Sequence, residues 1–455
     1  MSLLRLAFQK APPCEVSVGV SWPILFTVCT DLGDIGFEGE VNIEVNITIR
    51  IYSENPATPG SILLKKSVTL EPYYNAYQGW KVELTVPEKF KTTPSTRLQV
   101  AIEPNGELDG ILGCSHKVGE YLVLPVYSKP IQVVSAAPNL SKRQARCERI
   151  CRLPLEDKET QFDVVITEAC QDKQTLGTRL WDAAIVMSEY LTKLCDFIET
   201  IDKCKSTKVN IEELPSSEYE EILSKMELGS MEDWQQLKST TPMINGPATQ
   251  WLVSMLNLNK KKSNLNVIEL GCGCGLVGIS LARILEHQRT RAQVILTDLP
   301  EVLSVLSSNV ENNQELLTLG NKSSGSPPHK KSKSSQRVSV EVGELSWGND
   351  VTEQTLGLWK KCKWISDKAT ELPFIDLVLA ADVAYNSSSH SLLLATMITL
   401  AKSKKTAILI GYKPRVPEME KQFFAQAEVS FHRTLLYSHL GLHVFMFQLK
   451  TMKNV

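Results

Sequence analysis

A glycine-rich turn is the segment of this sequence with the clearest potential for chemistry. It reads Gly271-Cys-Gly-Cys-Gly-Leu-Val-Gly278, directly after the apolar run Val267-Ile-Glu-Leu270 and before a helical pattern. Glycine tolerates the left-handed backbone conformation and lets a ligand approach the main chain closely. The start of a helix adds free N–H groups and the positive end of the helix dipole. Four glycines in eight residues therefore indicate a ligand-binding turn rather than a tight connection without a ligand.

Two acidic residues accompany this turn. Glu269 lies in the preceding strand, and Asp298 ends the next predicted strand, Val294–Asp298. A carboxylate at the end of the second strand can accept hydrogen bonds from both ribose hydroxyls of a nucleoside. The pair favours S-adenosylmethionine as the ligand. Because Gly273-Cys-Gly-Leu-Val-Gly278 also fits G-x-G-x-x-G, and dinucleotide enzymes use a similar second acid, a dinucleotide stays open as the alternative.

Three further motifs stand around the turn in the sequence: Gly177-Thr-Arg-Leu-Trp181, Leu345-Ser-Trp-Gly348 and Asp382-Val-Ala-Tyr385. An indole ring can stack on adenine and exclude water. Aromatic faces and carboxylates are also favourable neighbours of a sulfonium cation. The three motifs therefore supply the groups that a sulfonium nucleoside would need.

Each of these residues also has a simpler explanation. Trp181 has helix-spaced apolar neighbours and fits a core residue, and Trp347 fits a loop anchor. Asp382 fits the N-cap of a following helix, and Tyr385 fits a half-buried packing residue. The joint occurrence of these residues with the glycine turn is what favours the functional interpretation.

In this order, the four motifs resemble those of the seven-β-strand protein-lysine methyltransferases of the group-16, methyltransferase-like-21 family, over about residues 161–455. The resemblance implies a Rossmann-like class I methyltransferase fold, an α/β sheet with helices on both faces. It also implies S-adenosyl-L-methionine as the cofactor and N-methylation of a protein lysine as the reaction. Relatives modify chaperones and translation elongation factors, so a protein substrate of one of these kinds is expected.

The resemblance also assigns roles to single positions. The Gly-x-Gly of the turn holds the methionine part of the cofactor, and the acid after the second strand holds the ribose. The tryptophan of L-x-W-G lies beside the adenine, and the residue before D-x-x-Y lines the site. The residues predicted to bind the cofactor are Trp181, Glu269, Gly271, Cys272, Gly273, Asp298, Trp347 and Ala381, and the predicted catalytic residues are Asp382 and Tyr385. No metal is expected.

Methyl transfer requires the neutral amine of lysine, whose pKa is about 10.4 in water. We predict that Asp382 and Tyr385 orient this amine, and that Asp382 steers the ammonium before its proton leaves to water. Many relatives follow the motif with an acid, but this chain has Asn386-Ser-Ser-Ser-His390, so no such acid is expected to grip the substrate. The segment Lys413-Pro-Arg415 either borders the substrate channel or forms a surface turn.

The composition is that of a soluble globular protein with two or three domains. The chain has 455 residues, of which 43% are hydrophobic and 22% charged, with a net charge of -2. A near-neutral charge argues against a dedicated nucleic-acid binder. No apolar run is long enough for a membrane span. The eleven cysteines form no C-x-x-C pair, which indicates a reduced intracellular protein, in the cytoplasm or alternatively the nucleus.

The hydrophobic period changes along the chain. Apolar and polar residues alternate over 41–51, and shorter alternations follow up to residue 126, which predicts an all-β, sandwich-like domain over 1–137. We expect this domain to be an interaction module or a stabilising appendage. A linker is predicted over 138–160 and the methyltransferase domain over 161–455. Continuous apolar strands separated by helices predict a parallel sheet there.

Two segments of the second domain look like insertions, residues 198–242 and 320–337. The second is basic and of low complexity, and its Lys330-Lys-Ser-Lys333 fits a nuclear signal or a solvated loop. The rival functions are a non-catalytic scaffold and a methyltransferase for small molecules or nucleic acid. A D/N-P-P-Y/F element, common in N-methylating nucleic-acid enzymes, is not matched by Asp382-Val-Ala-Tyr385. A monomer is expected.

Overall fold

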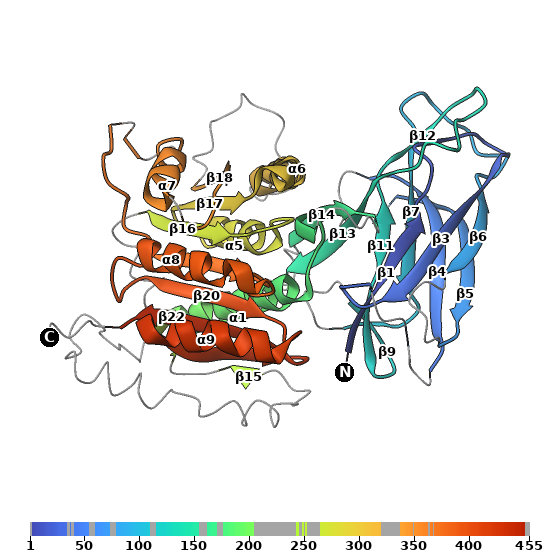
Figure 1. Cartoon of the computed structure of the whole chain (residues 1–455). Coiled ribbons are helices and arrows are strands. Elements are labelled where there is room, and N and C mark those ends of the chain that lie inside the picture. The colour runs from blue at the N-terminus through green and yellow to red at the C-terminus, as the bar shows by residue number, and fades with distance from the viewer. Residues whose placement is uncertain are drawn as a thin grey trace, which may run out of the picture. The chain divides into compact units, whose positions relative to one another are not determined.

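The chain divides into two compact units, residues 1–180 and 181–455 (Figure 1). The structure is a computed structural model. It describes residues 2–33, 37, 41–53, 60–72, 79–109, 115–153, 162–170, 176–203, 243–244, 248–249, 251–252, 264–319, 337–348, 350–362, 365–366 and 368–450.

The first unit consists of two β-sheets. One sheet has the strand order β6-β3-β1-β10-β9-β8, and the other has β14-β13-β11-β7-β12-β2 with β4 paired to β7 and β5 paired to β4. The strands are β1 Ser2–Lys10, β2 Glu15–Val16, β3 Ser21–Cys29, β4 Ile43–Ile51, β5 Ile62–Leu70, β6 Trp80–Thr85, β7 Arg97–Pro104, β8 Glu107–Asp109, β9 Ser115–Val118, β10 Tyr121–Leu124, β11 Val126–Ser128, β12 Ile131–Val133, β13 Arg146–Leu153 and β14 Phe162–Ala169.

The two sheets share one hydrophobic core, which confirms the predicted sandwich-like β domain. Leu6, Phe8 and Phe26 come from the first sheet, and Ile47 and Val100 come from the second. The alternation of apolar residues along each strand places one face of each sheet in this core. Most strand pairs are antiparallel, as expected, but β1 pairs with β10 and β2 with β12 in parallel.

The alternating pattern predicts that the polar face of β4 is exposed to solvent, but part of this face is buried. Thr48 and Arg50 are 3% and 8% exposed. The guanidinium of Arg50 donates from Nε to Gln99 Oε1 at 3.1 Å, and Gln99 Nε2 donates to Glu148 at 3.1 Å. A buried polar side chain is tolerated when hydrogen bonds replace its water, so a polar residue in a strand need not face solvent.

The boundary between the units lies later in the chain than the sequence indicates. Residues 146–153 of the expected linker form β13, and β14 follows, so both strands extend the second sheet of the first unit. The buried Glu168 of β14 accepts the N–H of Leu180 at 2.8 Å and the Nε–H of Arg149 at 2.6 Å. These bonds tie residues up to Leu180 to the β unit, although they precede the first long helix.

The second unit is built on one mixed sheet with the order β15-β21-β22-β20-β19-β16-β17-β18. The pairs among β16 to β20 are parallel, and β22 is antiparallel to β20 and β21. The strands are β15 Met243–Ile244, β16 Leu265–Leu270, β17 Ala292–Asp298, β18 Val338–Glu344, β19 Leu377–Ala381, β20 Ala407–Tyr412, β21 Phe431–His439 and β22 Leu442–Leu449.

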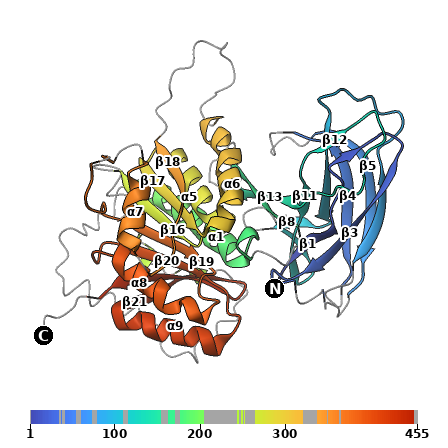
Figure 2. The same cartoon turned by 45° about the horizontal axis from the view of Figure 1, so that its top comes forward.

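Helices cover both faces of this sheet, as Figures 1 and 2 show. Helix α5 contacts both α1 and α6 on one face, and α7, α8 and α9 form the layer on the other face. The elements are η1 Leu176–Thr178, α1 Asp182–Lys203, α5 Leu276–His287, α6 Pro300–Leu319, α7 Val351–Trp359, η3 Ser387–Ser389, α8 His390–Leu400 and α9 Pro417–Ser430.

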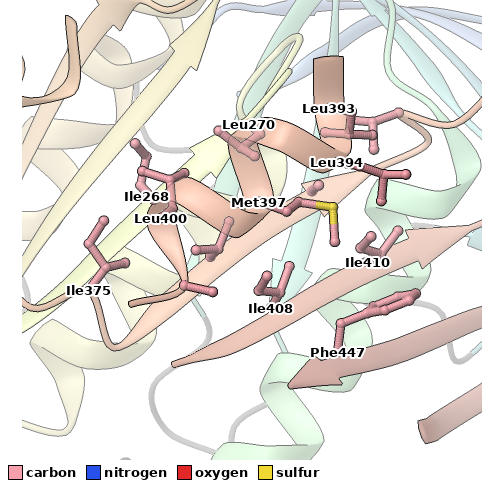
Figure 3. Close-up of a cluster of buried hydrophobic side chains, with 14 of the residues drawn as sticks. Ile268, Leu270, Ile375, Leu393, Leu394, Met397, Leu400, Ile408, Ile410 and Phe447 are labelled. Atoms are coloured by element: carbon pink, nitrogen blue, oxygen red, sulfur yellow. The ribbon is translucent and has the colours of Figure 1, made fainter. Parts of the chain in front are cut away.

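A large apolar core lies between the sheet and helices α7 to α9. Figure 3 shows part of this core, where Leu393, Met397 and Leu400 of α8 face Ile268 of β16 and Ile408 of β20. All five are at most 1% exposed. Apolar burial of this extent is the main favourable term that holds the sheet and the helices together.

The predicted α/β architecture of the second unit is confirmed, with each expected central strand in a parallel pair. The predicted insertion 198–242 lies outside the described residues except at 198–203, which end α1, and at 320–337 only Arg337 is described. Among the helices that the structure describes, none combines the length and apolarity that a membrane span requires.

Candidate functional site

The glycine turn connects β16 to α5 through left-handed backbone. Gly271, Gly273 and Gly275 have φ values of 57°, 56° and 81°. Residues with a side chain rarely adopt this conformation, so the three glycines let the chain reverse within a few residues. Gly275 is the N-cap of α5, and its N–H donates to the carbonyl of Cys272 at 2.8 Å. The turn therefore presents the N-terminus of α5 at the carboxyl end of the central strand.

Glu269 fixes the helix side of the turn. Its side chain is 1% exposed, and its Oε2 accepts the N–H of Gly278 at 2.8 Å. Burial raises the pKa of this carboxyl to about 8, and the neighbouring charge of Asp298 adds to the shift. Glu269 was predicted to bind the cofactor, and this stays a prediction. In the structure its hydrogen bond with Gly278 holds the first turn of α5.

Asp298 fixes the other side of the same turn. It ends β17, and its Oδ2 accepts the N–H of Gly273 at 2.7 Å while Oδ1 accepts the N–H of Leu299 at 2.7 Å. Burial raises the pKa of this carboxyl, although both N–H groups act in the opposite direction. Cys272 donates its N–H to Thr297 at 3.0 Å. Burial raises the pKa of its thiol well above the ordinary value, so the thiol stays protonated at neutral pH.

The structure brings the L-x-W-G and D-x-x-Y motifs to this turn. A Cβ on Gly271 would lie 3.0 Å from Cζ2 of Trp347 and 3.2 Å from Cγ1 of Val383. The indole of Trp347, which the resemblance places beside the adenine, therefore lies against the first glycine of the turn. Trp347 is partly buried, and its neighbour Gly348 donates its N–H to Thr396 Oγ1 at 3.0 Å.

Trp181 reaches the same end of the sheet through the start of α1. The guanidinium carbon of Arg415, in the loop after β20, lies 5.1 Å from the centre of the Trp181 ring. The next residue, Asp182, is 1% exposed and accepts from Lys413 Nζ at 2.7 Å. Helix α1 packs directly on β20, since a Cβ on Gly411 would lie 3.0 Å from the carbonyl oxygen of Ala183. Trp181 thus lies at the site although a long segment separates it from the turn.

Asp382 occupies a strained position one residue beyond β19. Its φ is 58°, which costs about 1–3 kcal/mol in a residue other than glycine. Its N–H donates to Gly411 at 2.8 Å, next to the pairing of Ala381 with Gly411. Its carboxylate forms an ion pair with the guanidinium of Arg415, and the side chains are 7% and 10% exposed. A side chain held in this way fits a functional residue better than a surface residue.

Tyr385 lies at the open side of the site. The residue is 55% exposed. Partial burial raises the pKa of its hydroxyl, and the negative charges of Asp298 and Asp382 raise it further. The phenol thus feels both the predicted ribose acid and the acid of its own motif. It stays protonated at neutral pH and can donate a hydrogen bond.

The helix that follows is capped by Asn386 and not by Asp382. The side chain of Asn386 accepts the N–H and the hydroxyl of Ser388 at 3.1 and 2.8 Å, which starts η3. His390 is 4% exposed and lies 2.9 Å from the carbonyl of Ala384 through Nε2. The segment that replaces the acid of many relatives therefore serves the local fold.

Sequence reasoning missed the full role of the loop after β20. Of its two alternatives for Lys413-Pro-Arg415, the structure favours the one at the site. Glu420 of α9, 3% exposed, accepts the N–H groups of Arg415 and Val416 at 3.2 Å and the hydroxyl of Tyr412. One sequence signal could have revealed this role. Arg415 lies three positions after the end of the apolar strand β20, which pairs with β19, the strand before the D-x-x-Y motif.

The residues at this end of the sheet fit S-adenosylmethionine. The glycine turn offers backbone where side chains would interfere, and Asp298 supplies a carboxylate at the next strand end. Trp347 lies against Gly271, and Trp181 lies near Asp382 through Arg415. The glycine turn would hold the methionine part, Asp298 the ribose and Trp347 the adenine. Trp181 would line the pocket. Ligand sites of open α/β sheets form at the carboxyl ends of strands, where all of them lie.

Strand order, glycine turn and acids together define a class I methyltransferase. The sequence profile of a family described as lysine methyltransferase matches residues 245–430. A protein-lysine methyltransferase of Mus musculus, METTL21E, is 30% identical over 46% of this chain and 70% of its own. The chain belongs to this lysine methyltransferase family, and S-adenosylmethionine is its cofactor.

Two other relatives extend the comparison. A UPF0665 family protein of Schizosaccharomyces pombe is 23% identical over 90% of this chain and 88% of its own. The EEF1A lysine methyltransferase 3 of Xenopus tropicalis is 32% identical over 35% of this chain and 51% of its own. The similarity to the fission-yeast protein covers the β unit as well, whereas the profile match lies wholly within the second unit.

The first prediction concerns Gly278, whose missing side chain lets α5 approach β17. A Cβ there would lie 2.1 Å from Cδ2 of Leu296 and 2.5 Å from Oε2 of Glu269. We expect Gly278→Ala to lower the free energy of unfolding by about 1–3 kcal/mol through overpacking. The control is Gly357→Ala in α7, where a Cβ would meet no atom within 4 Å beyond its chain neighbours and its own helix backbone, and alanine should stabilise by about 1 kcal/mol. Urea titrations measure both, and equal effects would contradict the close packing.

The second prediction concerns pH and Glu269. In the folded protein its carboxyl keeps its proton up to about pH 8, whereas the unfolded chain releases it near the ordinary value of 4.5. The free energy of unfolding should therefore fall as the pH rises between these values, by about 4–5 kcal/mol in total. Glu269→Gln should remove this slope, because an amide does not ionise. Glu353→Gln, on the exposed face of α7, is the control.

Urea titrations between about pH 5 and pH 8 measure the effect. A wild-type slope that persists in Glu269→Gln would show that another group carries it, and the assignment would be wrong.

Proposed function

We propose that the protein is a protein-lysine N-methyltransferase. The observation that carries this proposal is the joint placement of Asp382 and Tyr385 beside the glycine turn, with Trp347 against Gly271. Support for lysine as the target comes from the family and from relatives named as protein-lysine methyltransferases. When bound, S-adenosylmethionine would supply a methyl group to a neutral lysine amine, with the electron pair of the carbon–sulfur bond left on sulfur and the amine's proton released to water.

The chain's own residues bind and orient the reacting groups. The hydroxyl of Tyr385 can donate or accept a hydrogen bond at the mouth of the site, since it is partly exposed and protonated. Asp382, one residue beyond β19, is close enough for its charge to act on this hydroxyl. Orientation of an amine in line with the methyl group supplies much of the rate in such a displacement. Trp181 and Trp347 exclude water from the cofactor and so favour loss of the ammonium charge.

We propose a translation elongation factor or a chaperone as the substrate. One relative is named as an EEF1A lysine methyltransferase, and others are named as protein N-lysine methyltransferases. We place the reaction in the cytoplasm, with the nucleus as the alternative. The protein acts as a monomer in this proposal, and its β unit serves as an interaction module. The near-neutral net charge of -2 supports a protein substrate over nucleic acid.

The test is methyl transfer from labelled S-adenosylmethionine into an extract of cells that lack this protein. The expected result is a labelled protein band that appears with the pure full chain and disappears without it. Mass spectrometry of the band should locate the methyl groups on lysine. Label on small molecules or nucleic acid, with none on protein, would overturn the proposal.

The third prediction concerns Asp382. We expect Asp382→Asn to lower the rate of methyl transfer by about 10²-fold, because the strand-end carboxylate that fixes the site geometry is lost. Cofactor affinity, measured by calorimetry, should change far less, since the glycine turn and Asp298 are intact. Glu418→Gln is the control, because that carboxyl is 83% exposed and pairs with Lys421 on the outer face of α9. A normal rate for Asp382→Asn would exclude a catalytic role.

A further inference from the structure

The carboxylate of Asp382 is already engaged. Arg415 Nη2 binds its Oδ2 and Arg415 Nε lies 3.4 Å from its Oδ1. Two contacts from one guanidinium to one carboxylate fix the relative orientation of both groups. Since the side chains are 7% and 10% exposed, water screens this pair poorly. An incoming lysine therefore meets a carboxylate whose charge is largely compensated.

Besides Asp382, two further residues hold Arg415 in place. Its guanidinium carbon lies 5.1 Å from the centre of the ring of Trp181, the residue just before α1. Its backbone N–H donates to both carboxylate oxygens of Glu420, a residue of α9, each at 3.2 Å. A long side chain loses much conformational freedom in such a position, so the arrangement has a cost that a surface turn would not require. The pair is a built part of the site.

The charges around the Asp382–Arg415 pair determine how the site would shift the pKa of a substrate amine. Three other acids lie nearby. Asp298 ends β17, and Asp182 at the start of α1 forms an ion pair with Lys413. The carboxylate of Glu420 accepts backbone N–H groups. The hydroxyls of Tyr385 and Tyr412 also face this region, and burial raises the pKa of both. Arg415 is thus the cation in direct contact with the acid of the D-x-x-Y motif in the described part of the site.

We propose that Arg415 is a positioning residue that neutralises Asp382 and thereby makes the site accept the substrate lysine as a neutral amine. This inference rests on the proposed function. An uncompensated carboxylate within about 4–6 Å raises the pKa of a neighbouring amine by about one to three units, and a nearby cation opposes that shift. Together with desolvation between the two indoles, the compensated pair favours release of the proton to water before the nitrogen attacks the methyl carbon.

A bisubstrate probe tests this proposal without knowledge of the protein substrate. The probe is an adenosine derivative in which a tertiary amine replaces the sulfonium and carries an aminoalkyl arm, isotopically labelled at the carbon next to the terminal amine. The chemical shift of this carbon, followed by NMR between about pH 6 and pH 11, reports the pKa of the terminal amine in complex with the full chain.

In the wild-type complex the amine pKa should be lower than in the free probe. In Arg415→Gln it should rise by at least about one unit relative to the wild-type complex, because Asp382 is then uncompensated. Arg415→Lys keeps the charge and should stay close to the wild type, even if the lost stacking weakens binding. Lys421→Gln removes an exposed charge that pairs with Glu418 on α9 and should leave the amine pKa unchanged.

The outcomes separate the two proposals. If the wild-type chain binds the probe and Arg415→Gln leaves the amine pKa unchanged, Arg415 has a structural role and the inference is wrong, while the proposed function stands. Equal shifts in Arg415→Gln and Arg415→Lys would overturn it as well, because the charge would then not be the cause. If the wild-type chain does not bind the probe, the proposed cofactor site fails and the inference fails with it.

Discussion

The site depends on the turn between β16 and α5, where the main chain lies within hydrogen-bond distance of two carboxylates. Two carboxylates hold this turn from opposite sides, since Glu269 accepts the N–H of Gly278 and Asp298 accepts the N–H of Gly273. The bond to Gly278 needs a residue without a side chain, because a Cβ there would lie 2.5 Å from the Glu269 oxygen. The glycines are therefore required by the packing of the turn as well as by its left-handed conformation. Other residues of the site are positioned relative to this turn.

Parallel strands bring the remaining groups to the same edge of the sheet. Asp298 ends β17, Asp382 follows β19 and Arg415 follows β20, so residues over a hundred positions apart share one end of the sheet. The apolar core beneath α7 to α9 keeps these strand ends in register. Trp181 joins from the start of α1, which the Asp182–Lys413 ion pair ties to the loop after β20. The result is a site whose walls come from segments that lie far apart in the sequence.

The sequence predicted the elements with strong periodic signals. The strands around β16, β17, β19 and β20, the glycine turn and the β character of the first unit follow from local pattern, because burial on one or both faces dictates that pattern. The placement of Trp347 against the turn was predicted only through the family resemblance. It depends on the pairing of strands far apart in sequence, which local pattern does not reveal.

Other features could not be predicted for physical reasons. The sequence did not reveal that the carboxyl of Glu269 accepts the N–H of Gly278, because only the register of α5 places that N–H beside it. Arg50 of β4 looked solvent-exposed because its partner Gln99 comes from another strand. Residues 146–153 looked like a linker because basic residues hide their strand pattern, yet Arg149 forms a buried pair with Glu168. In each case a long-range polar partner overrides the local signal.

The most direct test of this account is a calorimetric titration of the full chain with S-adenosylmethionine, with NAD as the competing ligand. The account predicts one saturable binding event with S-adenosylmethionine, none with NAD, and much weaker binding when Asp298→Ala removes the acid beside the turn. A chain that binds NAD, or that gives no heat with S-adenosylmethionine while it is fully folded, would contradict the assignment of this site.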